Sequence, residues 1–311
     1  MWVVFVVAGF YGAAGYFASK EAIGDHPEWR RMIAQPSDFG LTGEVVEFRS
    51  RDSVLIKASL IACQESAKAT VILSHGQGGN RSHMLSRAAF LVKHGYNALV
   101  LDLRDHGESA GDYMTPGYIE ALDVLGAVNY LLQKGEKLPV ILLGYSYGAV
   151  ASLHAAARSK DIAAVIADAA FISYSDMMDR VAEYVMNDTS SSVGSKIGMG
   201  LYRFPFVVHA ANLAFETQTG VSVRPEQADA IASVPEVLQP VLFIAGEEDA
   251  IAPPQNTRLM YQKAVNPKKV LVVLPGATHS TYGKAKQEYQ TAVLKFLDSV
   301  LSDAIQNDTR R

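Results

Sequence analysis

A serine stands between two glycines in the stretch GYSYG at residues 144–148, directly after the apolar run Val140–Leu143. The G-x-S-x-G pattern alone is weak evidence, but here a predicted strand precedes it and small residues typical of a tightly packed helix follow it. A sharp strand-to-helix turn crowds the neighbouring backbone and therefore needs glycine on either side of the serine. Such a turn holds the serine in a strained conformation and lifts its hydroxyl above the sheet edge. Ser146 is therefore the candidate nucleophile.

A serine hydroxyl is a poor nucleophile at neutral pH and needs a base to accept its proton. The chain has eight histidines, and only His279 follows the last predicted strand. Because the carboxyl ends of parallel strands meet at one edge of a sheet, the His279 loop faces the same edge as Ser146. His75 and His106 also follow predicted strands and remain alternatives. Position along the chain favours His279 as the base.

The base in turn needs an acid that orients its ring and stabilises the imidazolium. Asp249 follows the predicted strand 241–245 and gives the chain order serine, aspartate, histidine, so it is the first choice. Asp168, at the end of the preceding predicted strand, is the second choice, and Glu248 is the third.

Apolar runs alternate with amphipathic segments along most of the chain. The predicted strands are residues 44–50, 54–60, 70–74, 98–101, 140–143, 162–167, 241–245 and 270–274. The predicted helices are residues 82–94, 117–132, 149–157, 254–265 and 286–301. Continuous apolar strands that alternate with helices are typical of a mostly parallel sheet with helices on both faces. The sequence therefore predicts an α/β fold.

One segment interrupts this alternation. Residues 171–239 carry helical patches and turn clusters but no clear strand, which predicts a helical cap inserted over the carboxyl edge of the sheet. The predicted organisation is thus an N-terminal helix over residues 1–19, a polar connector over residues 20–40 and an α/β domain over residues 41–311 that contains the cap.

The N-terminal residues 1–19 carry no charged side chain. As a helix rising about 1.5 Å per residue they would span about 28 Å, close to the thickness of the hydrocarbon core of a bilayer. No basic residue precedes this run, so an uncleaved single-pass membrane anchor is favoured over a cleaved signal peptide. An apolar helix packed on the domain is the alternative. Lys20, Arg30 and Arg31 follow the run and favour the cytoplasmic side for the rest of the chain.

Composition and charge exclude several classes of protein and site. Hydrophobic residues make up 49% and charged residues 19% of the 311 residues, which excludes a disordered chain. The net charge is −4 and no basic stripe is present, which argues against nucleic-acid binding. The single cysteine, Cys63, excludes an intramolecular disulfide and a cysteine-rich zinc site. The sequence contains no H-E-x-x-H metal motif, no Walker lysine motif and no G-x-G-x-x-G after a predicted strand, so no cofactor is expected.

The order of Ser146, Asp249 and His279, the turn after a central strand and the interrupted alternation resemble the α/β-hydrolase fold over about residues 41–301. The stretch SHGQGGN at residues 74–80 resembles the oxyanion turn of that family. By this resemblance, the backbone N–H groups of Gln77 and Tyr147 form the oxyanion hole, and His75 holds the turn.

A second stretch, DLRDHGES at residues 102–109, resembles a loop that is usually architectural in this family, which lowers the case for His106 as the base. Within the fold, the chain is similar to membrane-associated serine hydrolases of the Bem46 type and to the serine aminopeptidase group.

The resemblance implies a membrane-anchored serine hydrolase that cleaves carboxylic esters, including lipophilic acyl esters or thioesters. An amidase or serine peptidase on the same three residues is the first alternative, and a non-catalytic binding protein on a hydrolase fold is the second. The expected partners are a small-molecule or lipid ester and, through residues 1–19, a membrane. The sequence assigns no substrate-binding side chain.

Overall fold

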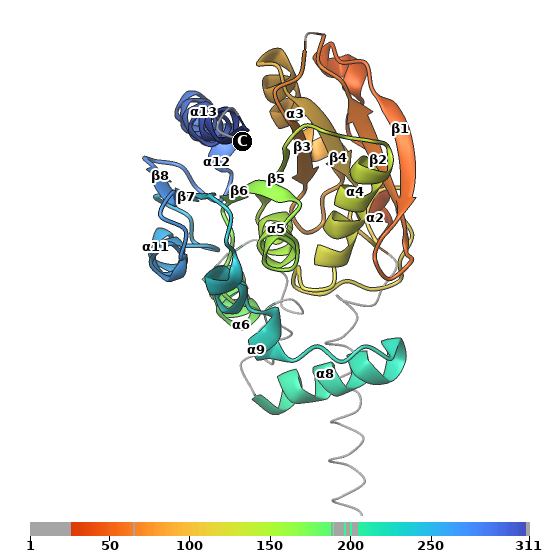
Figure 1. The fold of residues 1–311 in the computed structure, drawn as a ribbon. Helices are drawn as coiled ribbons and strands as arrows, with labels where there is room; N and C mark the ends of the chain where they lie inside the picture. Colours follow the sequence, from red (N-terminus) through yellow and green to blue (C-terminus); the bar gives the residue numbers. More distant parts are fainter. Residues whose placement is uncertain are drawn as a thin grey trace, which may run out of the picture.

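A computed structural model describes residues 26–64, 66–187, 189, 196, 200 and 205–308 of the protein. An eight-stranded sheet forms its centre, in the order β1-β2-β4-β3-β5-β6-β7-β8 (Figure 1). The strands are β1 (Glu44–Arg49), β2 (Leu55–Ile61), β3 (Thr70–Ser74), β4 (Asn97–Leu101), β5 (Val140–Tyr145), β6 (Ile162–Asp168), β7 (Val241–Gly246) and β8 (Val270–Leu274). β2 pairs antiparallel with β1 and with β4, and the other pairs are parallel. The predicted mostly parallel α/β fold is confirmed.

Helices cover both faces of the sheet. On one face lie α3 (Leu85–Lys93) and α13 (Lys286–Asp308), and on the other lie α4 (Ala121–Gln133), α5 (Tyr147–Ala157) and α11 (Pro254–Lys263) (Figure 1). Successive strand residues point to opposite faces. In β3, Ile72 therefore packs into the core beneath α4 and α5, while Val71 and Leu73 pack into the core beneath α3 and α13. Because both faces are buried, the central strands are continuously apolar.

Residues 169–240 connect β6 to β7 and correspond to the predicted cap. Their described part contains helices and no strand. The elements are α6 (Tyr174–Asn187), α8 (Pro205–Thr219), α9 (Pro225–Ala228), α10 (Ala230–Ser233) and the 3₁₀ helix η3 (Val234–Glu236). Figure 1 shows α8 set apart from the sheet, with α6 and α9 nearer to it.

His154 ties the end of this connection to α5. Its Nε2 lies 2.9 Å from the Ala228 carbonyl oxygen and its Nδ1 lies 2.6 Å from the Ser233 hydroxyl. A neutral ring meets both groups, since Nε2–H donates to the carbonyl and Nδ1 accepts from the hydroxyl. Burial lowers the pKa of His154 from 6.5 to about 4.

We expect His154 to make folding stability depend on acid. Between pH 6.5 and about 4, His154 is protonated in the unfolded chain but neutral in the folded protein. The free energy of unfolding therefore falls as the pH drops through that window. This pKa difference lowers the free energy of unfolding by about 3 kcal/mol once His154 is protonated in both the folded and the unfolded chain. Thermal unfolding from pH 7 to pH 4.5 should show a shallower loss of Tm for His154→Gln than for the wild type. His209→Gln, at an exposed position of α8, is the control, and equal slopes for His154→Gln and the wild type would contradict this role.

The predicted membrane anchor over residues 1–19 is corrected by the structure. In the described ranges, no helix combines the length and the apolar character needed to cross a bilayer. The longest of them, α13, carries charged side chains along its length, among them Lys286, Lys295 and Asp298. Residues 1–19 themselves lie outside the described residues. The membrane localisation inferred from their hydropathy, and with it the cytoplasmic orientation, is therefore not retained.

The described part of the predicted connector has regular structure. Two short helices, α2 (Pro27–Arg30) and the 3₁₀ helix η1 (Pro36–Phe39), precede β1. A further pair of short helices flanks the sheet edge: η2 (Arg81–Met84) leads into α3, and α12 (Thr281–Lys284) leads into α13.

Candidate active site

Ser146 occupies a strained turn between β5 and α5. Its backbone has φ 52° and ψ −113°, a region that non-glycine residues rarely adopt. The Asp168 carbonyl accepts the Ser146 N–H at 2.7 Å, which holds the strained residue in place. A Cβ on Gly148 would lie 2.4 Å from the Ser74 carbonyl oxygen, so only glycine allows the helix to start this close to β3. The structure thus contains the strand-to-helix turn that the sequence predicts, and the close approach of Ser74 explains why residue 148 must be glycine.

The His279 ring lies between Ser146 and Asp249. Its Nε2 is 2.9 Å from the Ser146 hydroxyl oxygen, and its Nδ1 is 2.8 Å from Asp249 Oδ2. The second carboxylate oxygen of Asp249 accepts the N–H groups of Ile251 and Ala252 at 2.9 and 2.8 Å. The carboxylate is fully buried, whereas the His279 side chain is 21% exposed. The three side chains predicted to meet at the sheet edge are therefore in contact.

The loops after β7 and β8 bring Asp249 and His279 together. The Glu248 N–H donates to the Ala277 carbonyl oxygen at 2.9 Å, which joins the two loops. A Cβ on Gly246 would lie 2.3 Å from the Thr278 carbonyl oxygen, so the close approach requires glycine at that position. Two neighbouring parallel strands thus deliver the acid and the base to the same edge.

Comparison with known proteins identifies the family. The pattern described as "Serine aminopeptidase, S33" matches residues 65–285, more than half of the chain. The chain belongs to this serine aminopeptidase S33 family. It is 26% identical over 257 residues to the protein bem46 of Schizosaccharomyces pombe, covering 81% of this chain and 75% of that protein. It is 28% identical over 236 residues to the uncharacterized protein YqkD of Bacillus subtilis, covering 74% and 72%.

Among solved structures, the esterase Pf2001 of Pyrococcus furiosus superposes with a TM-score of 0.67 at 25% identity, covering 86% of this chain and 96% of the esterase chain. This superposition and the family match establish an α/β hydrolase.

In this S33 hydrolase the alternative acid, Asp168, has other partners. Its carboxylate accepts from Arg87 at 2.9 Å and from the Thr281 hydroxyl at 2.6 Å. Asp168 is completely buried beneath the Ser146 turn, whereas Glu248, the third choice, is exposed. Asp249 alone among the three candidate acids contacts the His279 ring in the described residues.

His75 and His106 are also occupied elsewhere. In His75, Nδ1 donates to the Gly76 carbonyl oxygen at 2.8 Å and Nε2 accepts the Leu103 N–H at 3.0 Å. In His106, Nδ1 donates to the Arg104 carbonyl oxygen at 2.8 Å. Burial lowers the pKa of His75 well below its usual value and that of His106 to about 4, so both rings are neutral near pH 7. Both histidines stabilise loops of the S33 hydrolase, and neither is placed to accept the proton of Ser146.

The turn that contains Gln77 lies against Ser146. The Gly79 N–H donates to the Gly76 carbonyl oxygen at 3.0 Å, which closes the turn around Gln77. A Cβ on Gly76 would lie 3.6 Å from the Ser146 Cβ, so the turn borders the serine. Tyr147 is the first residue of α5, where a backbone N–H has no acceptor within the helix. Both predicted oxyanion donors thus lie next to the serine in sequence or in space.

Arg87 is a site-supporting residue that the sequence did not indicate. Its guanidinium lies 4.9 Å from the ring centroids of Tyr145 and Tyr282, and 5.4 Å from that of Tyr289. Tyr145 also donates its hydroxyl to the His279 carbonyl oxygen at 3.2 Å. Burial raises the pKa of Tyr145 to about 12, so its hydroxyl remains a donor near neutral pH. Arg87 and Asp168 form a buried ion pair. The Tyr145 ring links this pair to His279, because it contacts the Arg87 guanidinium and its hydroxyl donates to the His279 backbone.

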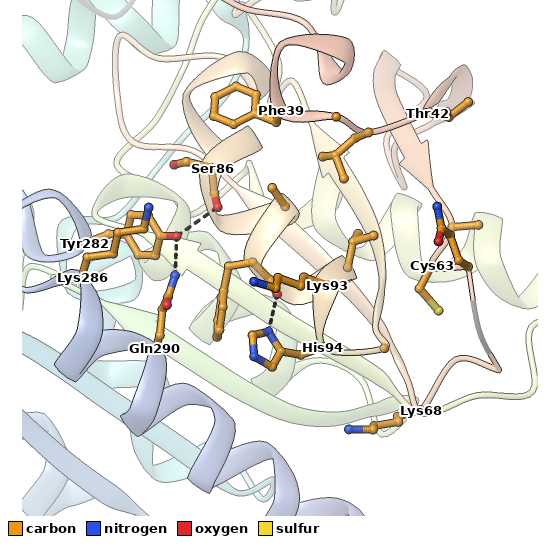
Figure 2. A pocket seen from close by; sticks show the side chains of 18 of the residues that line it. Phe39, Thr42, Cys63, Lys68, Ser86, Lys93, His94, Tyr282, Lys286 and Gln290 are labelled. Carbon is orange, nitrogen blue, oxygen red and sulfur yellow. Dashed lines mark hydrogen bonds between the residues drawn. The ribbon is translucent and has the colours of Figure 1, made fainter.

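A large cavity of about 960 Å³ lies apart from the Ser146 site. Figure 2 shows Lys93, His94 and Tyr282 around it, with Tyr282 donating to the Ser86 carbonyl oxygen at 3.0 Å. Ser146, Asp249 and His279 are not among its lining residues. The size of this cavity therefore says nothing about the substrate at Ser146.

Proposed function

We propose that this α/β hydrolase cleaves carboxylic esters with Ser146 as nucleophile, His279 as general base and Asp249 as the acid that orients His279. The observation that carries the proposal is the double contact of the His279 ring, 2.9 Å from the Ser146 hydroxyl and 2.8 Å from the Asp249 carboxylate. A base within hydrogen-bond reach of both the nucleophile and an orienting carboxylate is the arrangement that nucleophilic catalysis requires.

In the first step, Ser146 Oγ forms a bond to the acyl carbon while its proton passes to His279 Nε2. The carbonyl oxygen becomes an oxyanion, which accepts from the N–H groups of Gln77 and Tyr147. The buried Asp249 carboxylate stabilises the imidazolium through Nδ1–H. When the tetrahedral intermediate collapses, the bond from carbon to the leaving oxygen breaks, and the alcohol takes the proton from His279.

Water then completes the cycle. His279 removes a proton from a water molecule, whose oxygen bonds to the acyl carbon of the serine ester. The second tetrahedral intermediate breaks the bond to Ser146 Oγ, and Oγ regains the proton from His279. The carboxylic acid leaves, and every group of the protein returns to its starting state.

Covalent labelling tests the nucleophile. A fluorophosphonate probe should label the wild-type protein and the Ser302→Ala control, whose serine is exposed on α13, but not Ser146→Ala. The reason is that only a serine whose proton can pass to a base attacks phosphorus readily. Labelling that persists in folded Ser146→Ala would contradict the assignment, and a wild type that is never labelled would favour the non-catalytic binding protein.

Esters are favoured over amides because the chain resembles an esterase over 96% of that esterase's length. The family name points to the alternative, an aminopeptidase. An aminopeptidase needs an acidic group for the amine of the peptide, and Glu247 and Glu248 are exposed near Asp249. Of these, Glu247 accepts the Gly276 N–H at 3.1 Å. We expect p-nitrophenyl esters to give a higher kcat/KM than aminoacyl p-nitroanilides, and the reverse order would establish the peptidase.

A further inference from the structure

Residues 26–39, here called the N-terminal strap, run across the loop that contains Gln77. Asn80 Nδ2 donates to the carbonyl oxygens of Trp29 and Arg31 at 3.1 and 2.9 Å. The Ile33 N–H donates to the Ser82 hydroxyl at 3.1 Å. These bonds attach the strap to the residues that directly follow the Gln77 turn.

The strap also holds the neighbouring loop after β4. The Gly107 N–H donates to the Trp29 carbonyl oxygen at 3.1 Å. The Arg30 guanidinium donates to the Ser109 carbonyl oxygen and to the Asp105 carboxylate, both at 3.1 Å. Since the Trp29 carbonyl accepts from Asn80 and Gly107 together, the strap joins two loops that are far apart in the sequence.

The Trp29 ring lies between two imidazoles. It stacks on His26 with ring centroids 3.7 Å apart and an interplanar angle of 14°, and on His106 at 4.8 Å and 8°. A Cβ on Gly78 would lie 3.3 Å from the Trp29 indole nitrogen, so the ring edge also covers Gly78. Trp29 thus shields His106 and the far end of the Gln77 turn at once.

These two contacts lead to the peptide that carries the Gln77 N–H. The Gly76 carbonyl and the Gln77 N–H belong to one planar trans peptide and point in opposite directions. Because His75 donates to the Gly76 carbonyl oxygen at 2.8 Å, it also fixes the direction of the Gln77 N–H. The next N–H, that of Gly78, donates to His106 Nε2 at 3.2 Å. The His75 and His106 rings are in contact, with centroids 4.9 Å apart.

We propose that Trp29 is a positioning residue for the oxyanion hole: by stacking on His106 and covering Gly78, it holds the Gln77 turn so that the Gln77 N–H faces the oxyanion. The inference rests on the proposed function. The hydrogen bonds and ring contacts of Trp29 are to His26, Asn80, His106 and Gly107, and none of them is to Ser146. Trp29 acts through His106, His75 and the Gly76–Gln77 peptide.

Kinetics of full-length Trp29→Ala test the proposal. We expect kcat for p-nitrophenyl acetate to fall about tenfold with KM changed less than about twofold, because an oxyanion donor acts mainly in the transition state. Affinity for a trifluoromethyl ketone should fall in parallel with kcat. Ser146 Oγ adds to this ketone and leaves an oxyanion in the hole, so its affinity reports the donors directly.

Matched variants separate positioning from general stability. Trp29→Phe keeps a flat ring on His106 and should recover most of kcat. Trp29→Leu keeps bulk without a flat face; it should retain the fold and show the loss even if Trp29→Ala does not fold. Ile33→Ala, at a strap side chain that is 64% exposed, should behave as the wild type.

The outcomes distinguish this proposal from the proposed function. An active wild type with kcat and ketone affinity unchanged in Trp29→Ala or Trp29→Leu overturns the role of Trp29 alone, even where Tm falls. A wild type without activity on either esters or amides overturns both proposals. Loss of kcat and ketone affinity together, restored by Trp29→Phe, supports the positioning role.

Discussion

Replacing Ser146 or His279 by alanine is expected to lower kcat by about 10⁶-fold, with the double variant no worse than either single variant. The two side chains share one hydrogen bond of 2.9 Å, through which the proton leaves the nucleophile in the proposed mechanism. Once either is gone, the other has no catalytic step to perform, so the losses do not add. What remains comes from binding and from the oxyanion donors.

Burst and steady-state hydrolysis of p-nitrophenyl acetate by the three variants measures these losses, with thermal unfolding as the check on folding. Ser302→Ala is the matched control for loss of a serine hydroxyl. Losses that multiply in the double variant would contradict a shared step. A folded His279→Ala variant that kept most of the wild-type rate would remove His279 as the base.

The fold and the edge at which the site lies could be predicted from local signals. Apolar strands alternate with helices, and parallel strands place their carboxyl ends together. Ser146, Asp249 and His279 each follow such a strand, so topology alone places them at one edge of the sheet. Their side-chain contacts depend in addition on the loops after β7 and β8. The glycines at 148 and 246 belong to the same signal, because they permit the close approach of backbone that the turns require.

Arg87 could not be predicted because its partners lie far away in the sequence. A charged residue on an amphipathic helix is usually solvent-facing, since burial of an unpaired charge is costly. Here Asp168 and three tyrosine rings surround the guanidinium, and Arg87 is only 7% exposed. The hydrophobic periodicity of residues 82–94 predicts a helix but does not indicate which residues contact Arg87.

The contacts of the N-terminal strap could not be predicted for a related reason. Residues 26–39 have the polar, proline-containing composition of a connector, and their contacts with Asn80 and Gly107 run mainly through backbone carbonyls. Because every residue type has a backbone carbonyl, such contacts cannot be predicted from the amino-acid types alone. Hydropathy over residues 1–19 likewise indicates only a length of apolar chain, and the membrane localisation inferred from it has no support from any helix in the described residues.

The two buried aspartates near Ser146 should separate activity from stability. We expect Asp249→Asn to lower kcat by about 10⁴-fold, because an amide at this position favours the wrong tautomer of His279 and no longer stabilises the imidazolium. We expect Asp168→Asn to lower the free energy of unfolding by about 3–5 kcal/mol, because it leaves the buried Arg87 charge unpaired. The Asp249 carboxylate contacts His279 at 2.8 Å, whereas that of Asp168 contacts Arg87 and Thr281.

Each variant serves as the control for the other, since both replace a buried carboxylate by an amide of the same shape. Urea unfolding gives the stabilities, and ester hydrolysis well below the unfolding transition gives kcat. Asp168→Asn should keep kcat within about tenfold of the wild type where it is folded, because the contact of His279 with Asp249 is intact. The opposite pattern, with kcat lost in Asp168→Asn and kept in Asp249→Asn, would transfer the role of the acid to Asp168. Because the two carboxylates differ in their partners rather than in burial, this pair of measurements decides between a charge that acts in the reaction and one that holds the site together.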